Sequence, residues 1–380
     1  MNVREKLLAQ NDLLEKYIFE RETEIRMMNH IILTRNHSFY IGDPGCTKSM
    51  MVDMKRRLIH GIRYFYKNCH TYIKTSELVG PEDILKFKQS GLVEFIVDNH
   101  LVMADIAMLD EVFKAHKQLS ALLTVINERI FPQDTNTIVK SPLMSCFMAS
   151  NELPGDKELT AFYNRILFKF YVESITDFEN QIKLVYLDRM PPFPDNDPCS
   201  ITLDELKQAQ NEVLNVNIPR ETAETLVMLS NLSRNEFVKV SDRQIRWLAK
   251  PVQAEAWLNG RTEALPEDCE ILKHCLWNDP HKERDVIFSL VNKTCNQQLD
   301  DILTKLDTVI GPKGILADWR AAGPQANHKE TAEQIRLIKT ELEAMKPSEK
   351  NKSEHARVLK RVQLEHKMIL PFAVKQIQNR

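Results

Sequence analysis

The residues whose types and spacing most clearly suggest a chemical function lie at 42–49, where the chain reads GDPGCTKS. Glycines let a backbone turn so that successive N–H groups face one anion, and a helix that starts there adds partial positive charge. In loops of this kind a lysine such as Lys48 reaches the β- and γ-phosphates of a nucleotide, and a hydroxyl such as that of Ser49 ligates Mg²⁺. The segment therefore predicts a phosphate-binding loop between a strand and a helix.

One position departs from the usual G-x-x-x-x-G-K-[ST] pattern, because Thr47 rather than glycine precedes the lysine. A Cβ there narrows the approach to the phosphates, so a plain strand-to-helix turn with an incidental Lys-Ser stays open as the alternative. We interpret Cys46 as a small side chain, with a redox-sensitive thiol at a helix start as its alternative. The predicted nucleotide-binding residues are Gly42, Asp43, Pro44, Gly45, Cys46, Thr47, Lys48, Ser49 and Met50.

Further along the chain, an apolar run ends in two adjacent carboxylates, AMLDE at 107–111. An aspartate at a strand end beside a phosphate loop holds the Mg²⁺ shell, and a glutamate directly after it polarises a water for attack on the γ-phosphate. We therefore predict Asp110 as a metal ligand together with Ser49, and Glu111 as a catalytic residue. The alternative is a strand that simply reaches solvent at two acidic residues.

A third polar strand end is Asn151, which closes the apolar run at 141–151. An amide at this place can position the attacking water or touch the γ-phosphate, so we predict Asn151 as a catalytic residue that senses the nucleotide. An ordinary asparagine that makes a turn is the alternative.

Strands and helices must alternate around these residues if the residues are to meet at one edge of a sheet. The apolar runs predicted as strands lie at 38–41, 71–75, the second half of 101–112, and 141–151, with one hairpin arm at 91–99 that closes at Asp98 and Asn99. Amphipathic spacing predicts helices at 13–35, 49–66 and 117–131. Such alternation is typical of a parallel sheet covered by helices on both faces.

A proline-rich stretch at 189–198 predicts a linker, and from about residue 201 the pattern is helical apart from a short strand candidate at 237–242. Apolar stripes at 330–345 and 354–378 predict a long helical hairpin. The predicted domains are an α/β nucleotide-binding domain at 1–190, a helical lid at 191–280 and a helical C-terminal extension at 281–380.

Composition excludes several classes of protein. The 380 residues include 51 Lys and Arg against 53 Asp and Glu, so the net charge argues against nonspecific electrostatic binding of nucleic acid by the whole chain. No apolar stretch approaches the roughly 18 residues of a membrane span, and the N-terminus shows no signal-peptide core. The seven cysteines are scattered without zinc-ligand spacing, which predicts reduced thiols and a cytoplasmic location.

Six motifs in order, DPGCTKS, LDEVFKA, LLTVINERIF, ASNELP, FYNRILFKF and VSDRQIRWL, resemble the MoxR family of AAA+ ATPases, closest to its RavA branch, over residues 1–280. The resemblance implies an AAA+ P-loop NTPase core with a helical lid, and ATP with Mg²⁺ bound between the subunits of a ring, expected to be hexameric. It implies that Arg165 is an arginine finger for the neighbouring subunit and that Arg243 is a second sensor, with Arg246 as the runner-up. Arg129 is a weaker candidate for an intersubunit site.

The family's activity would be ATP hydrolysis that does chaperone-like work on a protein partner, and the resemblance implies a partner with a von Willebrand factor A domain. The β-rich insert of RavA-like chains has no counterpart in the roughly 100 residues after the lid, so its function does not carry over. Residues 346–380 hold nine Lys or Arg against three Glu, a surface for an acidic partner or simply a solvated helix face. A nucleic-acid-linked motor and a nucleotide-dependent scaffold with little turnover are the alternative functions.

Overall fold

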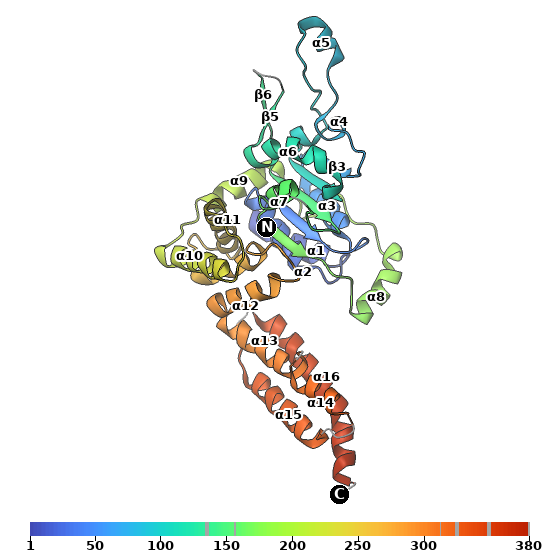
Figure 1. The fold of residues 1–380 in the computed structure, drawn as a ribbon, viewed down its shortest axis with the longest axis vertical. Helices are drawn as coiled ribbons and strands as arrows, with labels where there is room; N and C mark the ends of the chain where they lie inside the picture. The colour runs from blue at the N-terminus through green and yellow to red at the C-terminus, as the bar shows by residue number, and fades with distance from the viewer. Residues whose placement is uncertain (134–136, 156, 312, 324–326, 348–350, 379–380) are drawn as a thin grey trace. The chain divides into compact units, whose positions relative to one another are not determined.

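The computed structural model describes residues 1–133, 137–155, 157–311, 313–323, 327–347 and 351–378. The chain forms two compact units, Met1–Ile287 and Phe288–Arg380, and each is described by itself. Figure 1 shows the order of the elements within them.

A five-stranded parallel sheet forms the centre of the first unit, in the order β3-β4-β7-β1-β8. Two small pairs, β2 with β9 and β5 with β6, lie outside this sheet. The strands are β1 (Ser38–Ile41), β2 (Ile59–His60), β3 (Tyr64–Asn68), β4 (Ile106–Asp110), β5 (Ile130–Pro132), β6 (Ile138–Lys140), β7 (Ser145–Ser150), β8 (Phe168–Tyr171) and β9 (Ile201–Thr202). Since all five central strands point the same way, their carboxyl ends share one edge of the sheet.

Helices cover both faces of this sheet and continue into a helical region. They are α1 (Val3–Leu14), α2 (Glu22–Leu33), α3 (Lys48–Arg57), α4 (Ser76–Val79), α5 (Ile84–Ser90), α6 (His116–Glu128), α7 (Lys157–Tyr163), α8 (Phe178–Val185), α9 (Leu203–Leu214), α10 (Arg220–Asn235), α11 (Asp242–Leu258) and α12 (Arg284–Cys295). Short 3₁₀ helices are η1 (Leu101–Met103), η2 (Val112–Ala115), η3 (Leu187–Arg189) and η4 (Pro266–His274). The helices α10 and α11 pack on each other and on η4.

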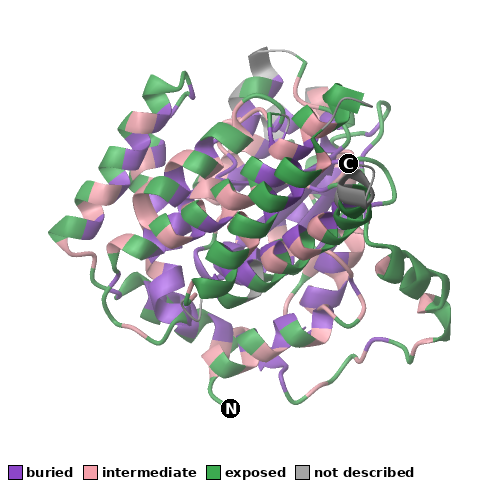
Figure 2. Ribbon diagram, turned by 90° about the horizontal axis from the view of Figure 1, so that it is seen from below, coloured by how far each residue is buried: buried purple, intermediate pink, exposed green. Residues whose placement is uncertain are grey.

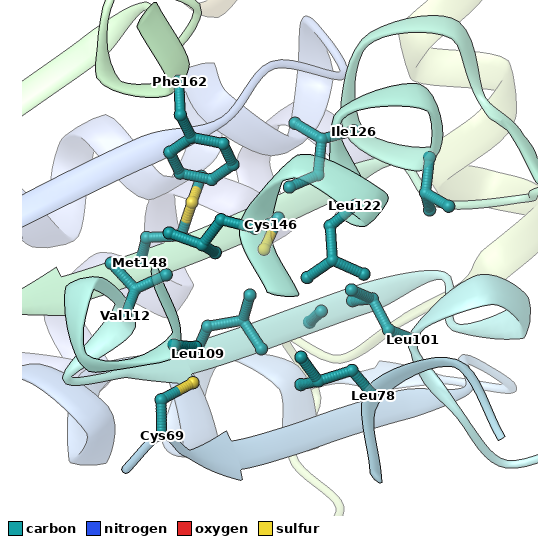
Figure 3. Close-up of a cluster of buried hydrophobic side chains, with 14 of the residues drawn as sticks. Cys69, Leu78, Leu101, Leu109, Val112, Leu122, Ile126, Cys146, Met148 and Phe162 are labelled. Atoms are coloured by element: carbon teal, nitrogen blue, oxygen red, sulfur yellow. The ribbon is translucent and has the colours of Figure 1, made fainter. Parts of the chain in front are cut away.

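Alternate residues of the buried strands serve opposite faces, as the two-residue period of a strand requires. Leu109 of β4 and Met148 of β7 meet Leu122 of α6 and Phe162 of α7 in one core cluster (Figure 3). On the other face Tyr40 stacks on Phe170, with ring centroids 5.1 Å apart. Figure 2 shows buried residues gathered on the strands and on the inward sides of the helices. Burial on both faces explains why these strands are continuous apolar runs.

The second unit is helical and has its own core. Its helices are α13 (Gln297–Ile310), α14 (Ile315–Ala322), α15 (His328–Ala344) and α16 (Lys352–Gln378). Ile302 of α13, Leu316 of α14, Ile335 of α15 and Val362 of α16 meet in this core. Because the four helices share one core, they are expected to fold or unfold together.

The α/β fold class predicted from the sequence, with a parallel sheet flanked by helices and helical regions after it, is confirmed. The strands predicted at 38–41, in the second half of 101–112 and at 141–151 are present as β1, β4 and β7. The helices predicted at 117–131, 330–345 and 354–378 are present as α6, α15 and α16. In each case a long apolar pattern and the tertiary packing favour the same element.

Other local predictions were wrong. The stretch at 13–35 is two helices, α1 and α2, because a turn in which Glu20 takes a φ of 57° lets them pack against each other. The helix predicted at 49–66 ends at Arg57, and Gly61, with a φ of 82°, turns the chain into β3.

Three strand predictions also failed. Residues 71–75 form a turn before α4, because β3 already occupies the place beside β4. Residues 91–99 make only one bridge, between Glu82 and Phe95. Residues 237–242 bury Val238 and Val240 without a strand partner, and Ser241 begins α11 as its N-cap.

Candidate functional site

The loop between β1 and α3 has the backbone that a phosphate cradle requires. A Cβ on Gly42 would lie 2.0 Å from the carbonyl oxygen of Val172, so only glycine fits against the segment after β8. Gly45 has a φ of 84° with open space around it, and Thr47 takes the left-handed conformation at a φ of 59°. No side chain caps the first turn of α3, which leaves its N–H groups for an anion.

Lys48 is buried and its ammonium group stays inside the loop. Its Nζ donates to the carbonyl oxygens of Gly42 at 2.5 Å and Asp43 at 3.1 Å. Burial lowers the pKa of Lys48, and the nearby carboxylates of Asp110 and Glu111 oppose that shift. The lysine is therefore held where the loop, the sheet edge and two carboxylates converge.

The helix behind the loop is fixed by a buried lysine that sequence reasoning missed. Lys55 Nζ donates to Gln10 Oε1 of α1 at 2.7 Å and to Asn29 Oδ1 of α2 at 2.5 Å. Burial lowers the pKa of Lys55 to about 7. No sequence signal distinguishes it from the neighbouring Arg56 and Arg57, because its role depends on two helices that are distant in the chain.

The strand order brings the predicted carboxylates to the same edge as the loop. β7 lies between β1 and β4, and the pairs Ile41 with Ser150 and Leu109 with Met148 set the register. Asp110 therefore ends β4 beside the end of β7. The last residue of β7, Ser150, accepts a hydrogen bond through its carbonyl oxygen from Gly42 N of the loop at 3.3 Å. Asn151 follows β7 and is exposed between the loop and Asp110.

Glu111 is held in an unusual conformation with one free carboxylate position. Its φ of 49° is left-handed, and its N–H donates to Asp110 Oδ1 at 3.0 Å. Lys114 Nζ lies 3.4 Å from Glu111 Oε2, yet this buried oxygen accepts no hydrogen bond from the residues that the structure describes. A strained backbone and an unsatisfied buried acceptor are typical of a group that awaits a water or a ligand.

Three predicted arginines lie apart from this edge. Arg165 is in the turn after α7, and β8 begins three residues later, paired from Phe168 with Ser38 of β1. Arg165 is thus at the amino edge of the parallel sheet, across the strands from its own phosphate loop. Arg243 and Arg246 are exposed near the start of α11, where Arg243 lies 6.0 Å from the ring of Trp247.

Arg129, the weaker candidate, is part of the fold instead. Its guanidinium donates to the carbonyl oxygens of Arg35 at 2.8 Å and Met144 at 3.2 Å, and it contacts His37. Burial lowers the pKa of Arg129 to about 10. With these donors committed to carbonyl oxygens, Arg129 is held within its own subunit, and a role for it at an intersubunit site stays a prediction.

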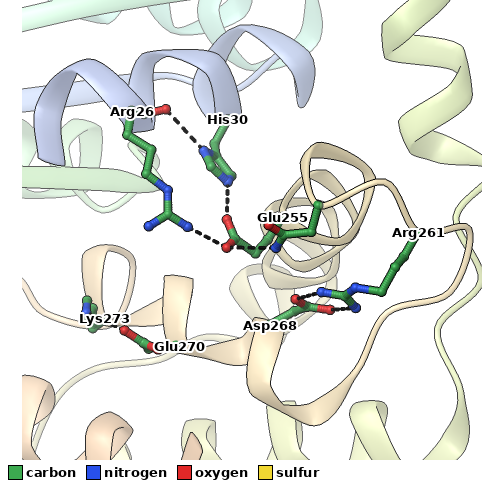
Figure 4. A network of polar contacts seen from close by, with 8 residues as sticks. Arg26, His30, Glu255, Arg261, Asp268, Glu270 and Lys273 are labelled. Atoms are coloured by element: carbon green, nitrogen blue, oxygen red, sulfur yellow. Dashed lines mark hydrogen bonds and ion pairs between the residues drawn. The ribbon is translucent and has the colours of Figure 1, made fainter. Parts of the chain in front are cut away.

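A buried ionic network joins α2 to α11 (Figure 4). His30 Nε2 lies 2.7 Å from Glu255 Oε2, and Arg26 pairs with the other oxygen of the same carboxylate. Nearby, Arg261 makes a two-pronged contact with the buried Asp268 at 2.7 and 2.5 Å. These contacts tie the helical region to the helix that precedes β1, so the position of Arg243 is coupled to the sheet.

The donor set fits a nucleotide phosphate chain and a divalent ion. The open first turn of α3 and the ammonium of Lys48 supply donors for phosphate oxygens. The hydroxyl of Ser49 and the carboxylate of Asp110 are hard oxygen ligands of the kind that Mg²⁺ prefers. The unsatisfied oxygen of Glu111 is an acceptor for a water molecule.

Comparisons with known proteins agree with this geometry. A family model described as the MoxR domain in the MoxR-vWA-beta-propeller ternary systems matches residues 5–216, more than half of the chain. A model of an AAA lid domain matches residues 221–290. Among the residues that the structure describes, no helix is long and apolar enough to cross a membrane.

Two proteins of Methanocaldococcus jannaschii are similar to the chain. The uncharacterized protein MJ0079 is 36% identical over 302 residues, which cover 78% of this chain and 78% of that protein. The uncharacterized protein MJ0812 is 36% identical over 284 residues, covering 73% and 74%.

A crystal structure of a protein from Cytophaga hutchinsonii, described as a candidate ATPase, superposes with a TM-score of 0.61. It is 19% identical and covers 77% of this chain and 94% of its own, which shows a shared fold. The matched MoxR and lid models, with the relatives and the phosphate loop, lead to one conclusion: the chain belongs to the MoxR family of AAA+ ATPases.

Proposed function

We propose that the chain binds ATP with Mg²⁺ and hydrolyses it at intersubunit sites of a hexameric ring, to remodel a protein partner that carries a von Willebrand factor A domain. One observation carries the hydrolytic part. The phosphate loop, Asp110, Glu111 and Asn151 all follow neighbouring parallel strands and meet at one edge. A protein that only binds nucleotide has no need of a second carboxylate beside the loop with a buried oxygen that accepts no hydrogen bond from the described residues.

Within one subunit, residues 42–50 bind the phosphates, and Lys48 neutralises the charge on the β- and γ-phosphates. Ser49 and Asp110 hold the metal ion, which supplies charge neutralisation when it is bound. Glu111 orients and deprotonates the attacking water, and its unsatisfied Oε2 is the acceptor for that proton. Asn151 orients the same water from the end of β7, which lies between β4 and β1.

Arg165 acts on the site of a neighbouring subunit. Its own loop lies at the opposite edge of the sheet, so a role at the γ-phosphate requires a second copy. Arg243 acts as the second sensor from α11, and the buried contact between Glu255 and His30 transmits its position to α2. These assignments need a ring, since a closed head-to-tail assembly supplies every loop with one Arg165.

The domains proposed are 1–190 for nucleotide binding, 191–280 for the lid and 281–380 for the helical extension. The order of the matched models, a MoxR domain at 5–216 and a lid at 221–290, and the separate compact unit from Phe288 support the order of these domains, while the bounds at 190 and 280 stay predictions. The partner with a von Willebrand factor A domain is supported by the description of the matched MoxR model. The likeness of the motifs to the RavA branch stays a prediction and does not enter this proposal.

Mixing two inactive variants tests the intersubunit site. Arg165→Ala subunits keep an intact phosphate loop, and Lys48→Ala subunits keep an intact Arg165. Each preparation alone should hydrolyse ATP about 10³-fold or more slowly than the parent protein, because arginine fingers contribute 10³–10⁵ in rate. Co-assembled rings should regain measurable ATPase activity. An Arg165→Ala protein with parental activity would contradict the assignment, as would mixed rings that recover nothing.

The partner is tested with the Glu111→Gln protein, which should hold ATP without turning it over. Proteins from the native host that it retains in ATP, and that Lys48→Ala does not retain, are identified by mass spectrometry. A von Willebrand factor A domain among them supports the proposed partner. A retained set without such a domain would refute that part of the proposal and leave the ATPase proposal standing.

A further inference from the structure

Helix α8 carries an exposed apolar face. None of its eight residues is buried. Phe178 and Val185 are 70% and 75% exposed, and Ile182 lies between them, so the spacing of four and three residues puts all three on one face. Asn180 lies on the opposite face and donates to Glu20 Oε1 at 3.2 Å. The apolar face is therefore directed away from the body to which α8 is attached.

This helix is joined directly to the wall of the phosphate loop. Val172 N donates to Ile41 O at 2.7 Å, and the carbonyl of Val172 is the group that excludes a Cβ at Gly42. Ser174 Oγ lies 3.9 Å from Cys46 Sγ within the loop. Asp177, the N-cap of α8, comes three residues later. A molecule that covers α8 consequently stands beside the phosphate loop.

A second surface, defined here as the Arg165 pocket, lies beside the turn that carries Arg165. It has a volume of about 530 Å³. Its lining residues are Asn164, Arg234, Phe237, Val238, Lys239, Val240, Ser241 and Gln244. Phe237 is 93% exposed and holds a φ of 62°, a conformation that is costly for a bulky side chain. The left-handed conformation belongs to the C-terminal cap of α10, where Val238 N donates to Ser233 O at 3.0 Å, and it leaves the Phe237 ring exposed at the rim of the pocket.

We infer that the apolar face of α8 in one subunit seats in the Arg165 pocket of a second copy of this chain. The inference rests on the proposed role of Arg165 at a neighbour's site: that neighbour must stand beside the phosphate loop, where α8 is. Charge is compatible with this contact, because Asp177 and Glu179 begin α8 and Lys239 lines the pocket beside Arg234, which pairs with Asp242 at 3.0 Å. α8 and the pocket are different surfaces, so the contact is head-to-tail and builds a closed ring when its rotation closes.

The first experiment removes the apolar face. A double variant, Phe178→Ser with Val185→Ser, should sediment as a monomer in ATP and keep the parental affinity for ATP. Its ATPase rate should fall about 10³-fold, because a monomer lacks the Arg165 of a neighbouring subunit. The matched control is Ile84→Ser with Phe87→Ser, which alters two exposed apolar residues of α5. Parental assembly by the α8 variant, or equal loss of assembly in the control, would overturn the inference.

The second experiment tests the pairing itself by cross-linking with a short bis-maleimide. Six native cysteines are buried and Cys295 is half-buried, so the parent protein sets a low background. A chain with both Val185→Cys and Phe237→Cys should yield a ladder of covalent oligomers. An equal mixture of the two single variants should yield covalent dimers only, since each subunit then has one reactive position. Either single variant cross-linking to itself at the same rate would indicate a symmetric contact and overturn the pairing.

These readouts separate this inference from the proposed function. Cross-linking and mass in solution do not require hydrolysis, so a protein that assembles through α8 without ATPase activity refutes only the proposed function. A protein with parental ATPase activity after loss of the α8 face refutes only the docking of α8.

Discussion

Replacement of Glu111 by glutamine tests the proton-accepting role that we propose for this side chain. Glutamine has the same length and shape, and the left-handed backbone at this position treats the two residues alike. The change removes a charge 3.4 Å from Lys114, which is half-exposed, so little stability is at stake. It also replaces the buried, unsatisfied Oε2 by an oxygen or amide nitrogen that cannot take a proton from water.

General-base catalysis contributes about 10²–10⁴ in rate, which corresponds to about 3–5 kcal/mol of barrier. We expect turnover by Glu111→Gln to fall within that range while ATP affinity stays within a few-fold of the parent. Steady-state phosphate release gives the first quantity and equilibrium titration with a fluorescent ATP analogue the second. Glu128→Gln, which changes an exposed carboxylate at the end of α6, is the matched control. Loss of affinity with the turnover of bound ATP unchanged would show that Glu111 only shapes the loop.

Four further predictions concern other parts of the chain. Lys48→Ala should abolish ATP binding in the same titration, because the cation on the phosphates is lost while the backbone cradle remains. Gly42→Ala should lower the free energy of unfolding by about 1–3 kcal/mol in urea titration through its clash with Val172, more than Gly45→Ala, which has open space. The pKa of Lys55 is lowered from 10.5 to about 7, so its burial reduces the free energy of unfolding fully below about pH 7, and this cost shrinks as the pH rises toward 10.5. Lys55→Met should therefore flatten the rise of the denaturation midpoint with pH above about pH 7. Deletion of residues 297–380, which removes the whole shared core of α13–α16, should leave a folded chain that binds ATP, as gel filtration and titration would show.

The candidate site was predictable because its residues follow directly from strand ends. A buried parallel strand is an apolar run, and its carboxyl end is where the first polar residue stands, so Asp110 and Asn151 were identified without knowledge of the strand order. A glycine in such a loop likewise indicates a close backbone contact, as Gly42 makes with the carbonyl of Val172. Their common position at one edge then follows from the parallel arrangement alone.

What could not be predicted depends on contacts between distant parts of the chain. The turn at Glu20 contains neither glycine nor proline, and its carboxylate accepts from the N–H groups of Thr176 and Asp177, more than 150 residues away. Lys55 resembles its basic neighbours until Gln10 and Asn29 surround it. The short strand β3 was missed because its amphipathic residues also suit a helix, and only pairing with β4 decides between them.

The positions of Arg165 and Glu20 are consistent with the intersubunit site that we propose. Arg165 precedes β8 at one edge of the sheet, and the phosphate loop follows β1 at the other edge, so no rotamer change joins them within one subunit. Glu20 accepts hydrogen bonds from the backbone N–H groups of Thr176 and Asp177 at the start of α8, the helix that we propose as the docking surface for the neighbouring subunit. Under the proposed function, an isolated subunit holds the residues that bind ATP but lacks the arginine finger of its neighbour. Hydrolysis then depends on protein concentration through the contact that brings Arg165, whereas ATP binding does not, and a rate per subunit that rises with concentration is the expected signature.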